Sequence, residues 1–187
     1  SNARVPTRDI QRLAWRIYPY IAAELFLRWS EAELPAVVEG VLACLAEHGL
    51  IEPDPEVEGW RRSPPASATA MQLSLLAQAT IQTIERYYVV VAQLVTAGSG
   101  ALDQATLEER CQQTAQRVAL LYGLDSPEFF DRTMFANFIA LLRTRGVIRA
   151  GGGGKLLFDD VLLRVAQDAQ FVLSEPLRHS ILQIMHA

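Results

Sequence analysis

The chain has 187 residues, a net charge of −4, a hydrophobic fraction of 50% and a charged fraction of 20%. This balance excludes an intrinsically disordered chain, which combines low hydrophobicity with high net charge. Two cysteines, 11 glycines and 9 prolines also exclude a disulfide-dense or collagen-like chain. The acidic balance lacks the basic footprint that is typical of nucleic-acid binding. We therefore expect one or two small globular domains and no nucleic-acid partner.

The first half of the sequence predicts two helices, a hairpin and a long helix. Residues 1–3 (Ser-Asn-Ala) are typical of the remnant of a cleaved tag, and we expect the chain from Arg4 onward to be a fragment of a longer protein. Thr7 is a candidate cap for a helix that Pro19 should kink or split. Ser30 is the expected N-cap of the next helix, which should end at Gly49. Helical spacing predicts one buried face on that second helix: Leu34, Val37, Val38, Val41, Leu42 and Leu45.

The hairpin is expected from strands at 50–52 and 60–62, with a turn-rich loop between them. A long helical pattern follows over 68–94. Its segment 87–92 is apolar all round, which favours a buried central helix over a docking face and is too short to span a membrane. The segment 96–100 is the best linker candidate.

The second half repeats this pattern of elements. Thr106 with Glu109 predicts a capping box for a helix that ends near Gly123, and Ser126-Pro127-Glu128 predicts the next helix start. Strands at 147–149 and 156–158 flank a glycine run that indicates a hairpin turn rather than a phosphate loop. Helices are expected over 159–173 and from 174 to the end. Residues 45–51 (Leu-Ala-Glu-His-Gly-Leu-Ile) match residues 142–148 (Leu-Arg-Thr-Arg-Gly-Val-Ile).

The predicted fold class is therefore mainly α with two small β-hairpins (α+β). The order of elements in each half is that of a winged helix, so we expect two winged-helix-like modules in tandem, at 4–98 and 99–187.

Candidate functional residues gather on the two hairpins. Trp60 with Arg61 and Arg62 forms one cluster, and a second cluster comprises Arg143, Arg145, Arg149 and Lys155. Arginine beside tryptophan suits a lipid headgroup layer or another anionic partner, whereas a plain solvated face is the alternative.

Other reactive residue types point to structural roles. No histidine has a second ligand at metal spacing, so no metal site is expected. His48 should cap its helix. Cys44 and Cys111 lie in apolar helical patterns and should be buried, reduced thiols.

Three stretches carry a resemblance to a known family: residues 18–30 (Tyr-Pro-Tyr-Ile-Ala-Ala-Glu-Leu-Phe-Leu-Arg-Trp-Ser) with Glu33-Leu34-Pro35, residues 48–51 (His-Gly-Leu-Ile), and residues 127–131 (Pro-Glu-Phe-Phe-Asp). They resemble the C-terminal region of the bacterial membrane-bound glycerol-3-phosphate acyltransferase. The resemblance covers nearly the whole chain and is weakest at the glycine-rich second hairpin and the C-terminal end.

The resemblance implies a parent enzyme that transfers a fatty acyl group from acyl-CoA or acyl-carrier protein to glycerol 3-phosphate, giving lysophosphatidate for phospholipid synthesis. It implies a location at the cytoplasmic face of the inner membrane, with the fragment itself soluble, and no cofactor. The family's catalytic signature is a histidine general base followed five positions later by aspartate. Here Pro53 stands at that distance from His48 and Ile184 from His179, while His186 is too close to the end.

We therefore expect a non-catalytic domain that packs against the catalytic acyltransferase domain of the same polypeptide and helps to orient it on an anionic membrane surface. The alternative is a tandem winged-helix module that binds nucleic acid or protein. Glu31, Glu33, Glu39 and Glu47 on or beside the second helix oppose nucleic acid by repelling phosphates. A self-contained enzyme is the third interpretation, and no constellation of residues supports it.

Overall fold

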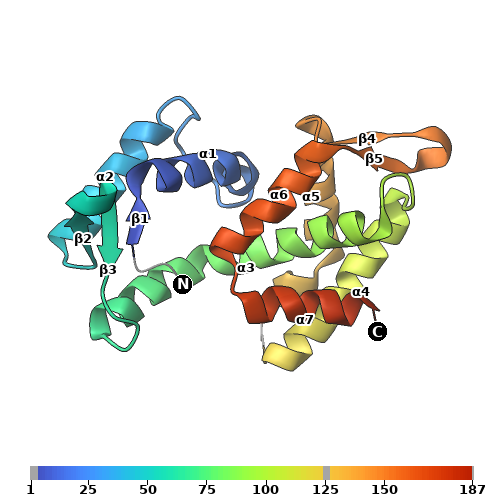
Figure 1. The fold of residues 1–187 in the computed structure, drawn as a ribbon. Coiled ribbons are helices and arrows are strands. Elements are labelled where there is room, and N and C mark those ends of the chain that lie inside the picture. The colour runs from blue at the N-terminus through green and yellow to red at the C-terminus, as the bar shows by residue number, and fades with distance from the viewer. Residues whose placement is uncertain (1–3, 124–126, 187) are drawn as a thin grey trace. The chain divides into compact units, whose positions relative to one another are not determined.

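The structure is a computed structural model that describes residues 4–123 and 127–186 (Figure 1). The expected tag remnant at residues 1–3, and Ser126 of the expected helix start, lie outside the described residues. The mainly α class with small antiparallel hairpins is confirmed. The chain divides into two compact units, Ser1–Thr80 and Ile81–Ala187, and the division falls within a single long helix. Each unit is described by itself.

The first unit contains a three-stranded sheet and two complete helices. Its elements, in order, are β1 (Arg4–Pro6), α1 (Thr7–Glu24), α2 (Leu34–Glu47), β2 (Ile51–Asp54), a 3-10 helix (Pro55–Val57), β3 (Gly59–Arg62) and the first part of α3 (Ala68–Ala97). The expected hairpin is confirmed as the antiparallel pair β2–β3. The strand β1 was not predicted. It pairs with the other edge of β3, which gives the sheet order β1-β3-β2.

Both helix starts in this unit differ from the predictions. Thr7 is already helical and its side chain does not cap, because the residue before it, Pro6, takes the cap position. Helix α2 begins at Leu34, not directly after Ser30. The hydroxyl and backbone N–H of Ser30 both donate to the Glu33 carboxylate, at 2.7 and 2.8 Å, so this pair closes a turn ahead of the helix. Pro35 then fits the first helical turn, where no N–H is needed.

Pro19 does not split its helix. Helix α1 runs without interruption from Thr7 to Glu24 with Pro19 inside it. The neighbouring Tyr18 is buried, and its hydroxyl donates to the Trp29 carbonyl at 2.6 Å. Tertiary packing therefore stabilises the turn of α1 that contains Pro19. Packing of this kind offsets the hydrogen bond that proline removes from a helix.

The expected buried face of α2 is only partly buried. Of the six predicted core residues, Leu34 and Leu42 are buried, whereas Val41 is 50% exposed. Val37, Val38 and Leu45 are half-buried. The prediction of six core residues was therefore wrong, because α2 packs mainly against α1 and β2 within this unit. The unit leaves apolar surface in contact with water.

The second unit holds the rest of α3 and a helical core. Its further elements are α4 (Gln104–Tyr122), a 3-10 helix (Pro127–Phe130), α5 (Arg132–Thr144), β4 (Ile148–Ala150), a 3-10 turn (Gly152–Gly154), β5 (Leu156–Phe158), α6 (Asp160–Val172) and α7 (Glu175–His186). Strands β4 and β5 pair antiparallel around the glycine run, which confirms the second hairpin.

The expected buried central helix is confirmed in this unit. Val89 and Val90 of α3 are completely buried, and the Tyr87 ring stacks on Phe138 of α5 with centroids 3.8 Å apart. Helix α4 contributes Leu107 and Val118, also completely buried, to the same unit.

Aspartates start the helices of the second unit. Asp103, Asp131 and Asp159 cap α4, α5 and α6 by accepting from the backbone N–H of Thr106, Thr133 and Val161. The capping box predicted at Thr106 was therefore wrong by three residues. The predicted helix start at Pro127 is a 3-10 helix, and α5 begins only at Arg132. In both places a nearby aspartate takes the cap, because its short carboxylate reaches the free N–H groups of the first turn.

The sequence repeat corresponds to a structural repeat. Helices α2 and α5 both end in a left-handed glycine, Gly49 (φ 67°) and Gly146 (φ 70°). In each, the next residue donates back to a carbonyl five residues earlier, Leu50 to Leu45 and Val147 to Leu142, at 2.9 Å. This is the Schellman pattern, in which the residue after the glycine is apolar. Leu50 and Val147 are both buried.

The two units also share an extended segment ahead of their first complete helix, α1 or α4. In the first unit β1 lies on the return strand β3. In the second unit Asp103 bridges to Lys155, and the Leu156 N–H donates to the Leu102 carbonyl at 2.8 Å, on the edge of β5. The two winged-helix-like modules at 4–98 and 99–187 remain a prediction, and the compact units divide the chain at a different place, between Thr80 and Ile81.

Candidate functional site

The first predicted cluster lies on strand β3 of the first unit. Trp60 sits opposite Val5 and Pro53, is half-buried, and its indole Nε1 is buried without a hydrogen-bond partner among the described atoms. Arg61 is exposed, and its Nη2 donates to the Glu52 Oε2 at 2.9 Å across the hairpin. Arg62 is exposed as well. The Trp60 side chain is therefore partly buried, whereas Arg61 and Arg62 are exposed at the surface of the sheet.

Acidic side chains neutralise this hairpin. Arg4 joins it through β1 and forms ion pairs with Asp54, at 3.1 Å, and with Glu56. The sheet and its turn thus bring three arginines together with four carboxylates: Glu52, Asp54, Glu56 and Glu58. Asp54 is buried, whereas the Arg4–Glu56 and Arg61–Glu52 pairs are exposed and contribute little to stability, because water and salt screen them. The carboxylates nevertheless offset the positive charge that the adjacent arginines in the sequence suggest for this hairpin.

The second predicted cluster surrounds the β4–β5 hairpin. The Lys155 Nζ lies 3.2 Å from the Asp103 Oδ2. The pKa of Asp103 falls from 3.8 to about 2, first because the Thr106 backbone N–H donates to its carboxylate, then through the Thr106 side chain and Lys155. Lys155 therefore belongs to the cap of α4 and ties the hairpin to that helix.

The three arginines of this cluster are exposed. Arg143 donates to the Gln104 Oε1 at 3.3 Å, and Arg149 stands 3.9 Å from the Asp159 carboxylate with its side chain 66% exposed. Arg145 is exposed at the C-cap of α5. The segment 143–158 holds these three arginines and Lys155 but no Asp or Glu of its own. Asp103 and Asp159, from outside the segment, offset two of these four charges, which leaves a smaller excess of positive charge. The two clusters belong to different compact units.

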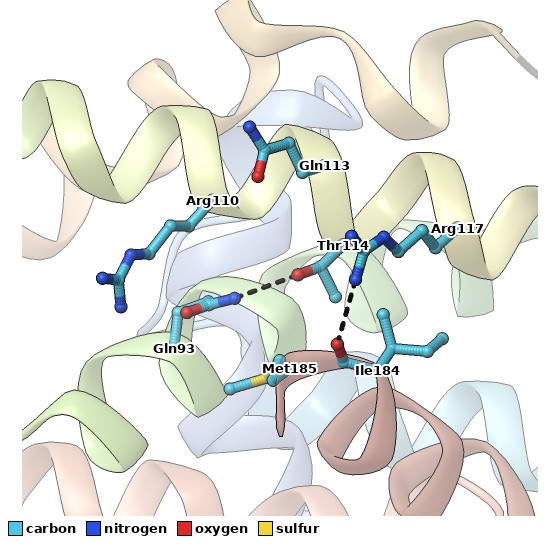
Figure 2. A pocket seen from close by; sticks show the side chains of 7 residues that line it. All are labelled: Gln93, Arg110, Gln113, Thr114, Arg117, Ile184 and Met185. Carbon is cyan, nitrogen blue, oxygen red and sulfur yellow. Dashed lines mark hydrogen bonds between the residues drawn. The ribbon is translucent and has the colours of Figure 1, made fainter. Parts of the chain in front are cut away.

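A polar pocket that sequence reasoning missed lies within the second unit (Figure 2). It has a volume of about 180 Å³ and is lined by side chains of α3, α4 and α7: Gln93, Arg110, Gln113, Thr114, Arg117, Ile184 and Met185. The buried Gln93 Nε2 donates to the buried Thr114 Oγ1 at 2.9 Å. The Arg117 Nη1 donates to the Ile184 carbonyl at 3.4 Å.

The chemistry of this pocket suits a small anion. Its lining holds two guanidinium groups and no carboxylate. A signal was present in the sequence, because Arg110, Gln113, Thr114 and Arg117 have the i, i+3, i+4, i+7 spacing of one helix face. The contributions of Gln93 and Ile184 come from helices far away in the chain and have no local signature.

His48 and His179 have no catalytic surroundings among the described residues. The His48 Nδ1 lies 2.8 Å from the Cys44 carbonyl in the last turn of α2, which confirms the predicted capping role. His179 is exposed, and the adjacent Ser180 bonds to the Tyr122 hydroxyl at 2.8 Å. Within 4–123 and 127–186, no group of three His, Cys, Asp or Glu side chains could hold a metal ion.

The cysteines correct one prediction. Both are free thiols, and Cys111 is completely buried as expected. Cys44 is exposed, so the prediction that it is buried was wrong. It lies two positions from the buried Leu42, a turn of about 200° around α2, and therefore points away from the buried face.

Two comparisons with known proteins identify the family of the chain. The family model of the glycerol-3-phosphate acyltransferase C-terminal region matches residues 1–151, so the match ends at the glycine run, where the resemblance is weakest. The chain is 40% identical over 185 residues to the glycerol-3-phosphate acyltransferase of Pseudomonas aeruginosa (strain UCBPP-PA14), and 38% identical to those of Pseudomonas putida (strain KT2440) and Ectopseudomonas mendocina (strain ymp).

Each alignment covers 98% of this chain and 22% of the relative, so the chain spans about a fifth of the length of the relatives it matches. No solved structure matches the chain. None of the helices within the described residues combines the length and apolar character needed to cross a membrane. Family model and relatives agree, and the chain belongs to the family of the glycerol-3-phosphate acyltransferase C-terminal region.

Proposed function

We propose that this chain is the accessory, non-catalytic region of an enzyme that transfers a fatty acyl group from acyl-CoA or acyl-carrier protein to glycerol 3-phosphate. The observation that carries the proposal is the alignment of 98% of the chain with only 22% of relatives named glycerol-3-phosphate acyltransferase. The remaining length of such a relative leaves ample room for a separate catalytic domain.

The side chains of this chain support a role without chemistry. Acyl transfer to a hydroxyl requires a positioned general base, and in this family a histidine with an aspartate five positions later supplies it. His48 and His179 lack that aspartate. His48 is engaged at a helix end, and His179 is exposed. The proposed partner is the catalytic domain of the same polypeptide. The proposed role of this region is to pack against that domain.

Acyl transfer by the purified 187-residue chain, beside the full-length parent enzyme, tests this proposal. With acyl-CoA and glycerol 3-phosphate as substrates, we expect turnover by the full-length enzyme and none by the chain. Removing the region that corresponds to this chain should lower the yield or activity of the parent, because its contacts stabilise the folded catalytic domain. Turnover by the chain alone, or a full-length parent without this activity, contradicts the proposal.

A second proposed role is to orient the catalytic domain on an anionic membrane surface, at the cytoplasmic face of the inner membrane. The net excess of cations beside the β4–β5 hairpin, which remains after Asp103 and Asp159 offset two of the four, favours it, since juxtamembrane cations are attracted to anionic lipid. The charge-neutralised first hairpin, with Trp60, Arg61 and Arg62, contributes less. Charge disfavours nucleic acid as a partner, because α2 and the turn before it carry four glutamates: Glu31, Glu33, Glu39 and Glu47.

A further inference from the structure

The first part of α3 is an exposed helix without a single charged residue. Residues 63–84 contain no Asp, Glu, Lys or Arg, an uninterrupted stretch of 22 residues in a chain with 38 such side chains. Within it, Met71 and Leu75 are each 64% exposed, and Leu76 is 58% exposed. Exposed helix surfaces in water normally carry charge, so this segment is unusual for a free surface.

The helix start is well fixed. The Ser67 hydroxyl accepts from the Ala70 N–H at 3.2 Å and donates to the Pro64 carbonyl at 2.7 Å. Further along, the Ser74 hydroxyl donates to the Ala70 carbonyl at 2.8 Å, and the Thr80 hydroxyl donates to the Ala77 carbonyl at 3.3 Å. The hydroxyls of Ser67, Ser74 and Thr80 are thus bonded to nearby backbone groups.

The exposed apolar side chains share one side of the helix. At about 100° per residue, Met71, Leu75 and Leu76 fall within a sector of about 140°. The residues between them on this side, such as Gln72, are uncharged. A stripe of that width is what a helix buries against a partner. Ala77 is also exposed but lies on the opposite side, outside the stripe.

The lack of charge indicates which kind of partner covers the stripe. Helices that lie in a membrane interface carry Lys and Arg on their polar face, and this segment has neither. Interfaces between proteins are depleted of charge at their centre and enriched in Met. The relatives extend far beyond the matched region, which supplies a protein partner tethered to this helix at high effective concentration.

We propose that the face of α3 formed by Met71, Leu75 and Leu76 is the docking surface for the catalytic domain of the same acyltransferase polypeptide. This inference rests on the proposed function and identifies the surface through which the accessory region acts. It assigns that role to an uncharged helix face, not to the arginines of the hairpins.

Cysteine labelling tests the proposal in both the 187-residue chain and the full-length parent. In a Cys44→Ala background, Leu75→Cys lies on the proposed face and Ala77→Cys on the other side of the same helix. Labelling at each position is quantified by mass spectrometry of the peptide that contains it. Leu75→Cys should react rapidly in the isolated chain and at least about tenfold more slowly in the full-length enzyme, the factor that about 1.4 kcal/mol of docking free energy produces. Ala77→Cys should react rapidly in both.

The outcomes separate the surface from the function. Equal labelling of Leu75→Cys in the chain and in a full-length enzyme that transfers acyl groups overturns the docking surface but leaves the proposed function intact. A full-length parent without acyl transfer overturns the function itself. Protection that requires lipid vesicles and is absent in detergent assigns the face to the membrane. Protection that grows with concentration of the isolated chain assigns it to a second copy. Either of these also overturns the proposal.

Discussion

Cys44 and Cys111 both lie in helical patterns of the sequence but have opposite environments in the structure. Cys111 is completely buried, and burial raises the pKa of its thiol well above the usual range, so the reactive thiolate is scarce. The exposed Cys44 Sγ lies 3.8 Å from the His48 Nδ1. The neighbours of Cys44, such as Leu42 and Leu45, are apolar, whereas those of Cys111, such as Arg110 and Gln112, are polar. Local composition therefore points to the wrong thiol, and the packing of α2 and α4 decides which one is buried.

We therefore expect thiol reagents to separate the two cysteines in the native chain. Cys44 should react at about the rate of a free thiol, and Cys111 should react only after denaturant is added. Mass spectrometry of the labelled protein should show one adduct under native conditions. Cys44→Ala should abolish that adduct, whereas Cys111→Ala should leave it unchanged. Two adducts at similar rates without denaturant would contradict the burial of Cys111 and the packing of α4.

The arginines show the same limit of local reasoning. Arg61 and Lys155 were correctly placed on hairpins by the strand and turn signals around them. Their partners, Glu52 and Asp103, lie 9 and 52 positions earlier, and pairing across such distances depends on the fold. The sequence around basic residues therefore predicts their place on a hairpin more reliably than it predicts the net charge of the surface around them.

At the scale of elements, helix ends were predicted better than helix starts. Gly49, Gly123 and Gly146 end their helices as expected, all with positive φ that glycine adopts at little cost. N-caps were missed because several polar residues near each helix start could act as the cap. Which one does so depends on the path of the chain before the helix. Strand β1 was missed for a related reason. Three residues carry no periodicity, and their pairing with β3 is nonlocal.

The C-terminal glycine of α2 offers a matched test within one helix. Gly49 has φ 67° and open space where the Cβ of another residue would stand, so Gly49→Ala adds backbone strain without a clash. We expect it to lower the free energy of unfolding by about 1–2 kcal/mol. Gly40 lies inside the same helix with equally open surroundings and ordinary φ, so Gly40→Ala should raise it by about 0.5–1 kcal/mol.

Chemical denaturation of both variants and the wild-type chain measures these changes as shifts of the midpoint in opposite directions. Gly146→Ala should repeat the loss seen for Gly49→Ala, because it occupies the same Schellman position in the second unit. A neutral effect of Gly49→Ala would mean that the helix end relaxes, and that the structural repeat at these two glycines is not maintained in solution.

At the scale of the whole molecule, charge and apolar surface are distributed unevenly. Between Arg62 and Asp103 the chain carries only two charged residues, Glu85 and Arg86. Arg86 is buried and donates to the Glu128 carbonyl at 3.1 Å, while burial raises the pKa of Glu85. The remaining described cations and carboxylates therefore lie on the hairpins, the shorter helices and the connecting segments. This uneven distribution of charge along the chain fits the proposal that the uncharged face of α3 contacts a protein.

The excess of cations at the β4–β5 hairpin makes membrane attraction measurable. Each cation close to an anionic bilayer contributes about 1 kcal/mol, and the attraction decays over a Debye length of about 10 Å in 0.1 M salt. The net charge of −4 opposes binding. We expect weak sedimentation of the chain with vesicles that contain anionic lipid, less with neutral vesicles, and a loss of binding as salt is raised.

Paired charge reversals locate this attraction. Arg145→Glu with Arg149→Glu should reduce vesicle binding more than Arg61→Glu with Arg62→Glu, because Glu52 lies 2.9 Å from Arg61 whereas Asp159 lies 3.9 Å from Arg149. Both double variants should keep the helical circular dichroism of the wild type, since these side chains are exposed. Equal sedimentation with anionic and neutral vesicles, unchanged by salt or by either reversal, would mean that both hairpins face solvent or protein. Membrane orientation would then have to come from the catalytic domain.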